Sequence, residues 1–222
     1  MAWVTFDLFS ALIDSRAGGT AAFDRIAAGH GWDVAGRDLY DDWDARNKAS
    51  QKDLPAQPWV TFAEHSRRAL DAAYAARGLR ADPAEDAAAL LATLPDWPLW
   101  PDVEAGLAAV ARDHRVGILS NVDDELFRRT RAAVLVDDDA VLTSERLRAY
   151  KPHPDIYRRA AEAGVDVHVP ASARDTRGAL EAGLAVVRVT RPGHRVDPAG
   201  PQPEHEVEDL TQLPAVLVSV AS

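Results

Sequence analysis

The segment that closes the first apolar run reads Phe6-Asp7-Leu8-Phe9-Ser10-Ala11-Leu12 and places a carboxylate among apolar side chains. The run over residues 3–9 predicts a buried strand, with Asp7 near its carboxyl end. A carboxylate in such surroundings is costly to bury unless it is hydrogen-bonded, paired with a cation or used in a reaction. Asp7 is therefore a candidate catalytic residue, and the alternative is a structural aspartate that caps the next turn.

Outward from this strand, short apolar runs alternate with longer alanine-rich stretches of helical periodicity. Such alternation is typical of βα units, so the sequence predicts an α/β fold with a doubly wound, Rossmann-like parallel sheet. The expected strands cover residues 3–9, 116–120, 140–143, 165–169 and 185–189. The expected helices among them cover residues 103–112, 124–133, 155–163 and 176–182.

About a hundred residues separate the first expected strand from the second, which is far more than one crossover connection needs. Helical patterns recur within this stretch at residues 20–28, 39–50, 60–76 and 83–94. We therefore expect an inserted helical cap domain over residues 15–95 and a Rossmann-like core domain over residues 1–14 and 96–222. The proline-rich segment 95–101 is the expected return hinge. Residues 191–206 are expected to form a surface loop before a short terminal segment, 210–220.

The composition is that of an ordinary globular protein, with 47% hydrophobic and 27% charged residues in a chain of 222. A formal net charge of −10, without any run of lysines and arginines, argues against binding to nucleic acid. The absence of cysteine excludes disulfides and thiolate chemistry. Because the first residues lead directly into a strand, we expect neither a signal peptide nor a membrane span, and we expect a cytoplasmic location.

Three further segments place polar side chains beyond the ends of expected strands. Ser120 and Asn121 follow the second strand, Lys151 lies in a proline-rich turn, and Asp175 opens a helical pattern. Because ligands bind beyond the carboxyl ends of parallel strands, we expect these side chains to meet Asp7 in one site. Each has a plain structural alternative, namely a helix cap for Ser120-Asn121 and for Asp175, and a solvated surface lysine for Lys151.

Taken in order along the chain, Asp7, Ser120, Lys151 and Asp175 resemble the four motifs of the haloacid dehalogenase superfamily. The resemblance covers nearly the whole chain, and the inserted region corresponds to the helical cap of that superfamily. It implies that Asp7 is the nucleophile, that Lys151 and Asp175 complete the catalytic set, and that Ser120 contacts the substrate.

Two departures favour the L-2-haloacid dehalogenase branch over the phosphatases of this superfamily. Phosphatases carry a second aspartate where this chain has Phe9, and an acidic Mg²⁺ ligand where it has Ala171. Loss of a proton donor and a metal ligand argues against phosphoryl transfer, which needs its charge neutralised. A halide leaves as a stable anion, so the resemblance implies no cofactor, with Mg²⁺ required only under the phosphatase alternative. The segment Tyr150-Lys151-Pro152-His153-Pro154, followed by Tyr157, is similar to the dehalogenase branch.

Other positions depart from the dehalogenase pattern. Ala11 stands where a threonine is usual, so one hydrogen bond to the nucleophile is expected to be missing. Arg174 replaces an aromatic residue, and Pro170 and Ser172 stand where serine and asparagine are usual. Arg46 is the expected cap arginine that holds the halide, with an exposed ion pair as the alternative. The expected substrate-binding residues are Ser120, Asn121, Arg46, Phe9, Tyr157 and Ser172.

The expected reaction converts a short (S)-2-haloalkanoic acid to a 2-hydroxy acid through an aspartyl ester on Asp7. The partner is then a small anionic substrate, a 2-haloalkanoate. Neither nucleic acid nor a membrane is expected, and a homodimer is compatible with the sequence. Two alternatives stay open: a phosphatase- or phosphonatase-like hydrolase with an atypical metal site, and a catalytically silent binding protein. Magnesium dependence would favour the first, and the absence of any turnover the second.

Overall fold

Six parallel strands form one sheet at the centre of the computed structural model, which describes residues 1–51 and 59–220. Their order across the sheet is β3-β2-β1-β4-β5-β6, so β1 lies in the interior, paired with β2 on one side and β4 on the other. The strands are β1 (Trp3–Phe6), β2 (Arg115–Ser120), β3 (Val141–Thr143), β4 (Val167–Val169), β5 (Ala185–Val189) and β6 (His205–Val207). The expected α/β fold with a doubly wound parallel sheet is confirmed.

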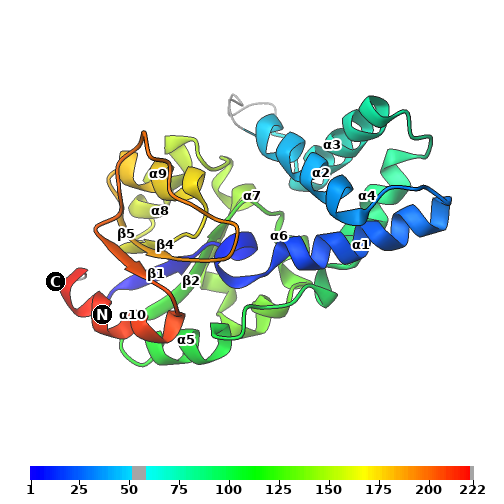
Figure 1. Cartoon of the computed structure of the whole chain (residues 1–222). Coiled ribbons are helices and arrows are strands. Elements are labelled where there is room, and N and C mark those ends of the chain that lie inside the picture. The colour runs from blue at the N-terminus through cyan, green and yellow to red at the C-terminus, as the bar shows by residue number, and fades with distance from the viewer. Residues whose placement is uncertain (52–58, 221–222) are drawn as a thin grey trace.

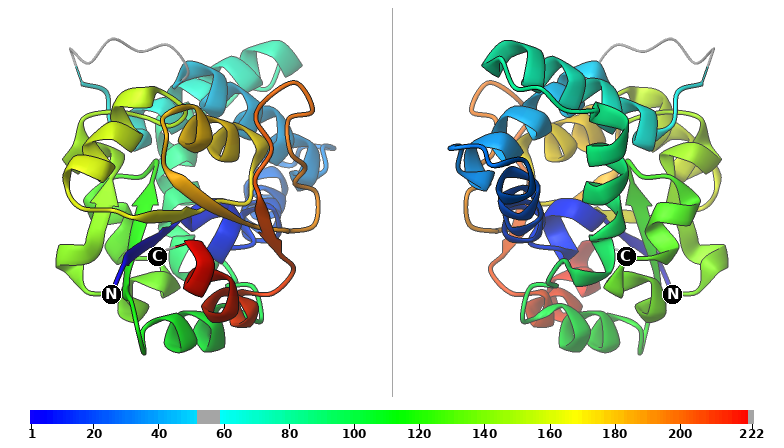
Figure 2. Two further views of the ribbon diagram at one scale, coloured as in Figure 1. Left: turned by 90° about the vertical axis from the view of Figure 1, so that its left-hand side faces the viewer. Right: turned by 90° about the vertical axis from the view of Figure 1, so that its right-hand side faces the viewer.

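Helices cover both faces of this sheet, as continuous apolar strands require. Figure 1 shows α8 and α9 over one face and α5 and α10 over the other, and both views of Figure 2 agree. The helices of this part are α5 (Val103–Val110), α6 (Asp124–Arg128), α7 (Ser144–Leu147), α8 (Pro154–Glu162), α9 (Ala173–Glu181) and α10 (Leu213–Val220).

Four further helices lie together beside the sheet, beyond the carboxyl ends of its strands (Figure 1). They are α1 (Ser15–His30), α2 (Gly36–Ser50), α3 (Phe62–Arg77) and α4 (Pro83–Ala92). The longest of them, α1 and α3, have 16 residues, and none of the helices in the described ranges is long and apolar enough to cross a membrane.

The two segments that join these helices to the sheet run side by side. Ile13 and Leu99 form an antiparallel bridge, and the Trp100 amide donates to the Leu12 carbonyl at 2.9 Å. We propose on this basis that residues 15–95 form the cap and that residues 1–14 and 96–222 form the core.

Two local predictions are wrong. The first strand ends at Phe6 rather than at residue 9, because the Asp7 carboxylate accepts the Ser10 amide and the chain turns into a π-helical turn, Leu8–Leu12. The expected surface loop 191–206 ends in β6, which pairs with β5. This edge strand was not predicted because polar side chains interrupt its apolar pattern. One of them, Glu206, forms an ion pair with Arg188 at 2.7 Å across the pair of strands.

A glycine in the middle of β2 gives a test of how tightly the sheet is packed. A Cβ atom at Gly117 would lie 2.3 Å from the Ala140 carbonyl oxygen and 2.5 Å from Nε1 of Trp3. We expect Gly117→Ala to lower the free energy of unfolding by about 1–3 kcal/mol, because backbone atoms must move to accommodate the methyl group.

The matched control is Gly29→Ala in α1, where a Cβ atom would have no neighbour within 4 Å. We expect that variant to gain roughly 0.5–1 kcal/mol, because alanine favours the helix. Urea unfolding of both variants measures the difference. Equal stability of the two would contradict the packing described for β2.

Candidate active site

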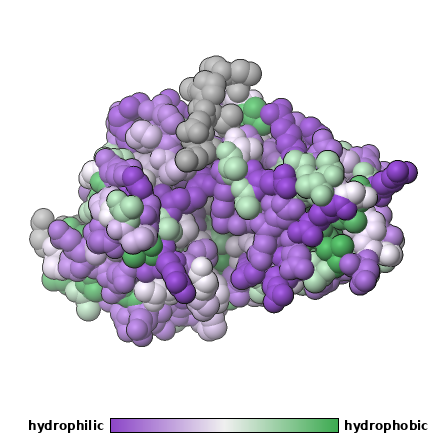
Figure 3. All heavy atoms as spheres, turned by 45° about the horizontal axis from the view of Figure 1, so that its top comes forward, coloured by the Kyte–Doolittle hydropathy of each residue, from purple (hydrophilic) through white to green (hydrophobic). Residues whose placement is uncertain are grey.

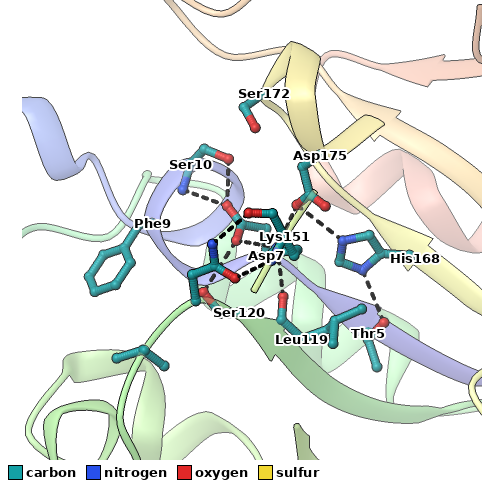
Figure 4. Close-up of polar contacts among 12 residues, drawn as sticks. Thr5, Asp7, Phe9, Ser10, Leu119, Ser120, Lys151, His168, Ser172 and Asp175 are labelled. Carbon is teal, nitrogen blue, oxygen red and sulfur yellow. Dashed lines mark hydrogen bonds and ion pairs between the residues drawn. The ribbon is translucent and has the colours of Figure 1, made fainter. Parts of the chain in front are cut away.

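Four segments far apart in the chain meet at the carboxyl end of the sheet, as the sequence predicted (Figure 4). Asp7 follows β1 directly, and Ser120 is the last residue of β2. Lys151 lies in the loop before α8, and Asp175 lies in the first turn of α9 after β4. Because β1 lies between β2 and β4, the topology itself brings the ends of these strands together.

Lys151 lies at the centre of the site, between the two carboxylates (Figure 4). Its Nζ donates to Oδ1 of Asp7 at 2.7 Å, to Oδ2 of Asp175 at 2.5 Å and to the Leu119 carbonyl at 2.8 Å. An ammonium group has three donors, so all of them are engaged. The residue is only 4% exposed, which rules out the solvated surface lysine.

Both oxygens of Asp7 accept hydrogen bonds. Oδ2 accepts from the Ser10 amide at 3.0 Å and the Ser10 hydroxyl at 2.6 Å, while Oδ1 accepts from the Ser120 hydroxyl at 3.3 Å. Ser10 thus donates two hydrogen bonds to Asp7, although Ala11 has no side-chain donor to offer. Ser10 belongs to the segment that follows the first strand. Its contact with Asp7 was not predicted because it depends on the turn after Asp7, which brings the hydroxyl back to the carboxylate.

Asp175 is held by residues behind the site. Tyr157 donates its hydroxyl to Oδ1 at 2.8 Å, and His168 contacts Oδ2 through Nε2 at 3.2 Å. The Nδ1 atom of His168 contacts the Thr5 hydroxyl at 3.1 Å. His168 was not among the residues predicted from the sequence, although it is a single polar residue inside the apolar strand Val167–Val169.

The ion pairs outweigh burial in setting the charge state of the site. Burial raises the pKa of Asp7, but the Lys151 ammonium and the hydrogen bonds from Lys151 and Ser10 bring it below its usual range. Burial likewise raises the pKa of Asp175, and Lys151 and His168 lower it well below the usual range. Burial lowers the pKa of Lys151, but the two carboxylates raise it above its ordinary value. All three groups are therefore charged near neutral pH.

A cavity of about 310 Å³ lies in front of these groups, between the sheet and the helices α1–α4. Figure 3 shows mainly hydrophilic residues around the hollow between these two parts of the molecule. The expected substrate-binding residues Phe9, Ser120, Asn121 and Ser172 all line it. The Phe9 ring stacks on Phe62, with 5.7 Å between ring centroids, and gives the cavity an apolar wall.

Two expected substrate-binding residues lie elsewhere. Tyr157 is fully buried behind Asp175, so its contact is with the carboxylate rather than with the cavity. Arg46 pairs with Asp42 at 2.6 Å, has a side chain that is 36% exposed, and is not among the residues that line the cavity. Arg174, one residue before Asp175, does line it.

The residues around Asp7 offer a poor metal site. Ala171 contributes no ligand, and Lys151 already supplies the positive charge between the two carboxylates. Within the described residues, no group of three or more histidines, aspartates or glutamates is placed to hold a metal ion.

Known proteins of one family resemble this chain in sequence. A family model of haloacid dehalogenase-like hydrolases matches residues 1–168. The (S)-2-haloacid dehalogenase 4A of Burkholderia cepacia is 30% identical to the chain over 132 residues. That match spans 56% of this chain and only 57% of the relative.

Solved structures extend the likeness to the whole fold. An L-2-haloacid dehalogenase from Xanthobacter autotrophicus superposes with a TM-score of 0.83 at 24% identity, over 100% of both chains. A defluorinating L-2-haloacid dehalogenase superposes with a TM-score of 0.82 at 26% identity, over 100% of this chain and 96% of the other. With the family model matching most of its length, this chain belongs to the haloacid dehalogenase-like hydrolases.

Proposed function

We propose that this chain hydrolyses the carbon–halogen bond of a short (S)-2-haloalkanoic acid, through an ester on Asp7. One observation carries the proposal. Asp7 lines the cavity, is ionised, and is held in place by hydrogen bonds from Lys151 and Ser10. Phe9 lies where a phosphatase would need a general acid. The dehalogenase names of the relatives support the same reaction.

In the first step, one carboxylate oxygen of Asp7 attacks C2 of the substrate from the side opposite the halogen. The new oxygen–carbon bond forms as the carbon–halogen bond breaks, and the halide leaves with the bonding electrons. No proton is required, which agrees with the phenyl ring of Phe9 beside the nucleophile. Splitting a difficult substitution into two easier steps is the ordinary benefit of covalent catalysis.

In the second step, water attacks the Cγ carbon of the Asp7 ester. The bond from Cγ to the ester oxygen breaks, so the oxygen that leaves in the 2-hydroxy acid came from Asp7 and not from that water. The Asp7 oxygen that remains as the carbonyl keeps its hydrogen-bond donors, which stabilise the negative charge that develops on it. Asp175 is ionised beside Lys151, and we place the attacking water near it, with one proton of that water passing to the oxygen of the 2-hydroxy acid and the other to solvent.

Under this proposal the reaction needs no metal. Two carboxylates already bridged by an ammonium are a poor site for Mg²⁺, which requires oxygen ligands in near-octahedral geometry. The substrate is a small monoanion, and the roles assigned to Asp7, Lys151, Asp175 and Ser120 belong to this proposal. A cytoplasmic location and a homodimer stay predictions that accompany it.

Asp7→Asn tests the nucleophile. An amide is a poor nucleophile, so we expect halide release from (S)-2-chloropropionate to fall by roughly a thousandfold or more. The fold is expected to survive, because Lys151 keeps Asp175 as its partner. Asp139→Asn, in the short 3-10 helix Asp138–Ala140 with an exposed side chain, is the matched control and should keep full activity.

An isotope experiment on the wild type tests the ester itself. In a single turnover in ¹⁸O water with excess enzyme, the product should carry no label and Asp7 should acquire it. Label in the first-turnover product would mean that water attacks C2 directly, and the ester mechanism would be wrong.

Lys151→Arg tests whether a compact ammonium is needed between the two carboxylates. A guanidinium keeps the charge but is larger and planar, so it cannot repeat the three short contacts of Nζ. Displacement of the nucleophile by about 1 Å is expected to lower kcat/KM on the order of a hundredfold. The measurement is kcat/KM of the variant together with its melting temperature, which separates a catalytic effect from a loss of stability. An unchanged kcat/KM would contradict the role proposed for Lys151.

Metal removal separates the proposal from the phosphatase alternative. We expect halide release to be the same in EDTA and in millimolar Mg²⁺, because Lys151 occupies the charge-neutralising position. Hydrolysis of phosphate monoesters should be absent under both conditions. A strict requirement for Mg²⁺ in either assay would favour the phosphatase.

A further inference from the structure

Three residues that line the cavity beside Asp7, namely Lys151, Asn121 and Ser120, have no side-chain donor to spare. The three donors of Lys151 are engaged by Asp7, Asp175 and the Leu119 carbonyl. The amide nitrogen of Asn121 donates to Gln51 and to the Lys151 carbonyl, which uses both of its N–H groups. The single hydroxyl proton of Ser120 points to Asp7. An anionic substrate therefore needs a side-chain donor other than these three residues.

The positive charges that line the cavity are almost all neutralised. Arg16 pairs with Asp41 at 2.5 Å, Lys48 pairs with Asp44 at 2.6 Å, and Lys151 pairs with Asp7 and Asp175. His194 adds no charge near neutral pH, because burial and the nearby Lys48 lower its pKa further below neutrality.

Arg174 is the exception. Within the described ranges, no carboxylate oxygen lies within ion-pair distance of its guanidinium, although the side chain lines the cavity. Its NH1 group donates to the Lys48 carbonyl at 3.1 Å, and its NH2 group donates to the Lys151 carbonyl. A guanidinium has five N–H donors, so three remain beyond these two contacts.

The surroundings of Arg174 make it a strong anion site. Burial lowers the pKa of its guanidinium, which stays protonated because its ordinary value is so high. Arg174 is partly buried, and a partly buried cation gains more from an anionic ligand than an exposed cation does. Its planar fork of N–H groups matches the two oxygens of a carboxylate.

We propose that Arg174 binds the carboxylate of the substrate and thereby makes this site selective for monoanionic acids over neutral analogues. The inference rests on the proposed function for the identity of the substrate. It places a binding charge for the carboxylate at the start of α9, beside Asp175, and is separate from the halide-holding role expected of Arg46. The contacts to the Lys48 and Lys151 carbonyls hold the guanidinium at the junction of α2 with the catalytic loop.

Binding of propionate and of propionamide by isothermal calorimetry tests this assignment without requiring turnover. The variant is Arg174→Gln, which removes the charge but keeps an amide donor. We expect Kd for propionate to rise at least about tenfold, since a hydrogen bond to a charged group is lost, while Kd for propionamide changes less than about twofold. Arg174→Lys should recover part of the affinity for propionate.

The matched control is Arg177→Gln on the same helix, whose arginine is exposed and paired with Glu181 and Asp197 away from the cavity. It should bind propionate as the wild type does. Unchanged propionate affinity in Arg174→Gln, or no propionate binding by the wild type, would overturn the proposal. Equal loss of propionate and propionamide affinity would also overturn it, because Arg174 would then only hold α2 to the loop.

Halide release distinguishes failure of the proposed reaction from failure of the proposed anion site. If the wild type releases no halide but loses propionate affinity on Arg174→Gln, the proposed reaction fails and the anion site stands. If turnover is present, the same variant should raise KM for (S)-2-chloropropionate at least about tenfold and leave kcat less affected.

Discussion

The rest of the site depends on one buried ammonium shared by two carboxylates. Lys151 contacts Asp7 and Asp175 with side chains that are 10% exposed or less, so each charge would be very costly to bury alone. Removing Lys151 would leave two buried carboxylates without a cation, so its ammonium fixes the relative positions of the first motif, the loop before α8 and the start of α9. The Leu119 carbonyl takes the third donor of Lys151 and ties the cluster to β2.

The topology of the sheet explains why these residues meet although more than a hundred positions separate Asp7 from Ser120. β1 is flanked by β2 and β4, and connections to strands on its two sides leave an opening beyond its carboxyl end. Asp7 lies at that opening, with Ser120 on one side and Asp175 on the other. The helices α1–α4 lie beyond the same edge of the sheet, so they face Asp7 across the cavity.

Periodicity and strand ends were enough to predict the parallel sheet and the convergence of Asp7, Ser120, Lys151 and Asp175. What they could not predict depends on contacts between distant residues. β6 was missed because an edge strand can be polar, and Ser10 because its role depends on the turn that follows Asp7. Arg46 was chosen by its place in the cap pattern, but periodicity says nothing about which acid a surface arginine meets, and Asp42 one turn earlier binds it.

Charge balance links the proposed reaction to the proposed role of Arg174. Asp7, Asp175 and Lys151 together carry one net negative charge, which would repel an anionic substrate unless another cation received it. With Arg174 included the group is neutral, and a monoanionic acid returns it to a single negative charge. Formation of the Asp7 ester then removes one charge from the protein, and the halide carries it into solvent. A phosphate dianion would bring a second negative charge, which Lys151 and Arg174 could not offset together with those of Asp7 and Asp175, so the charge balance favours the proposed haloacid over a phosphate ester.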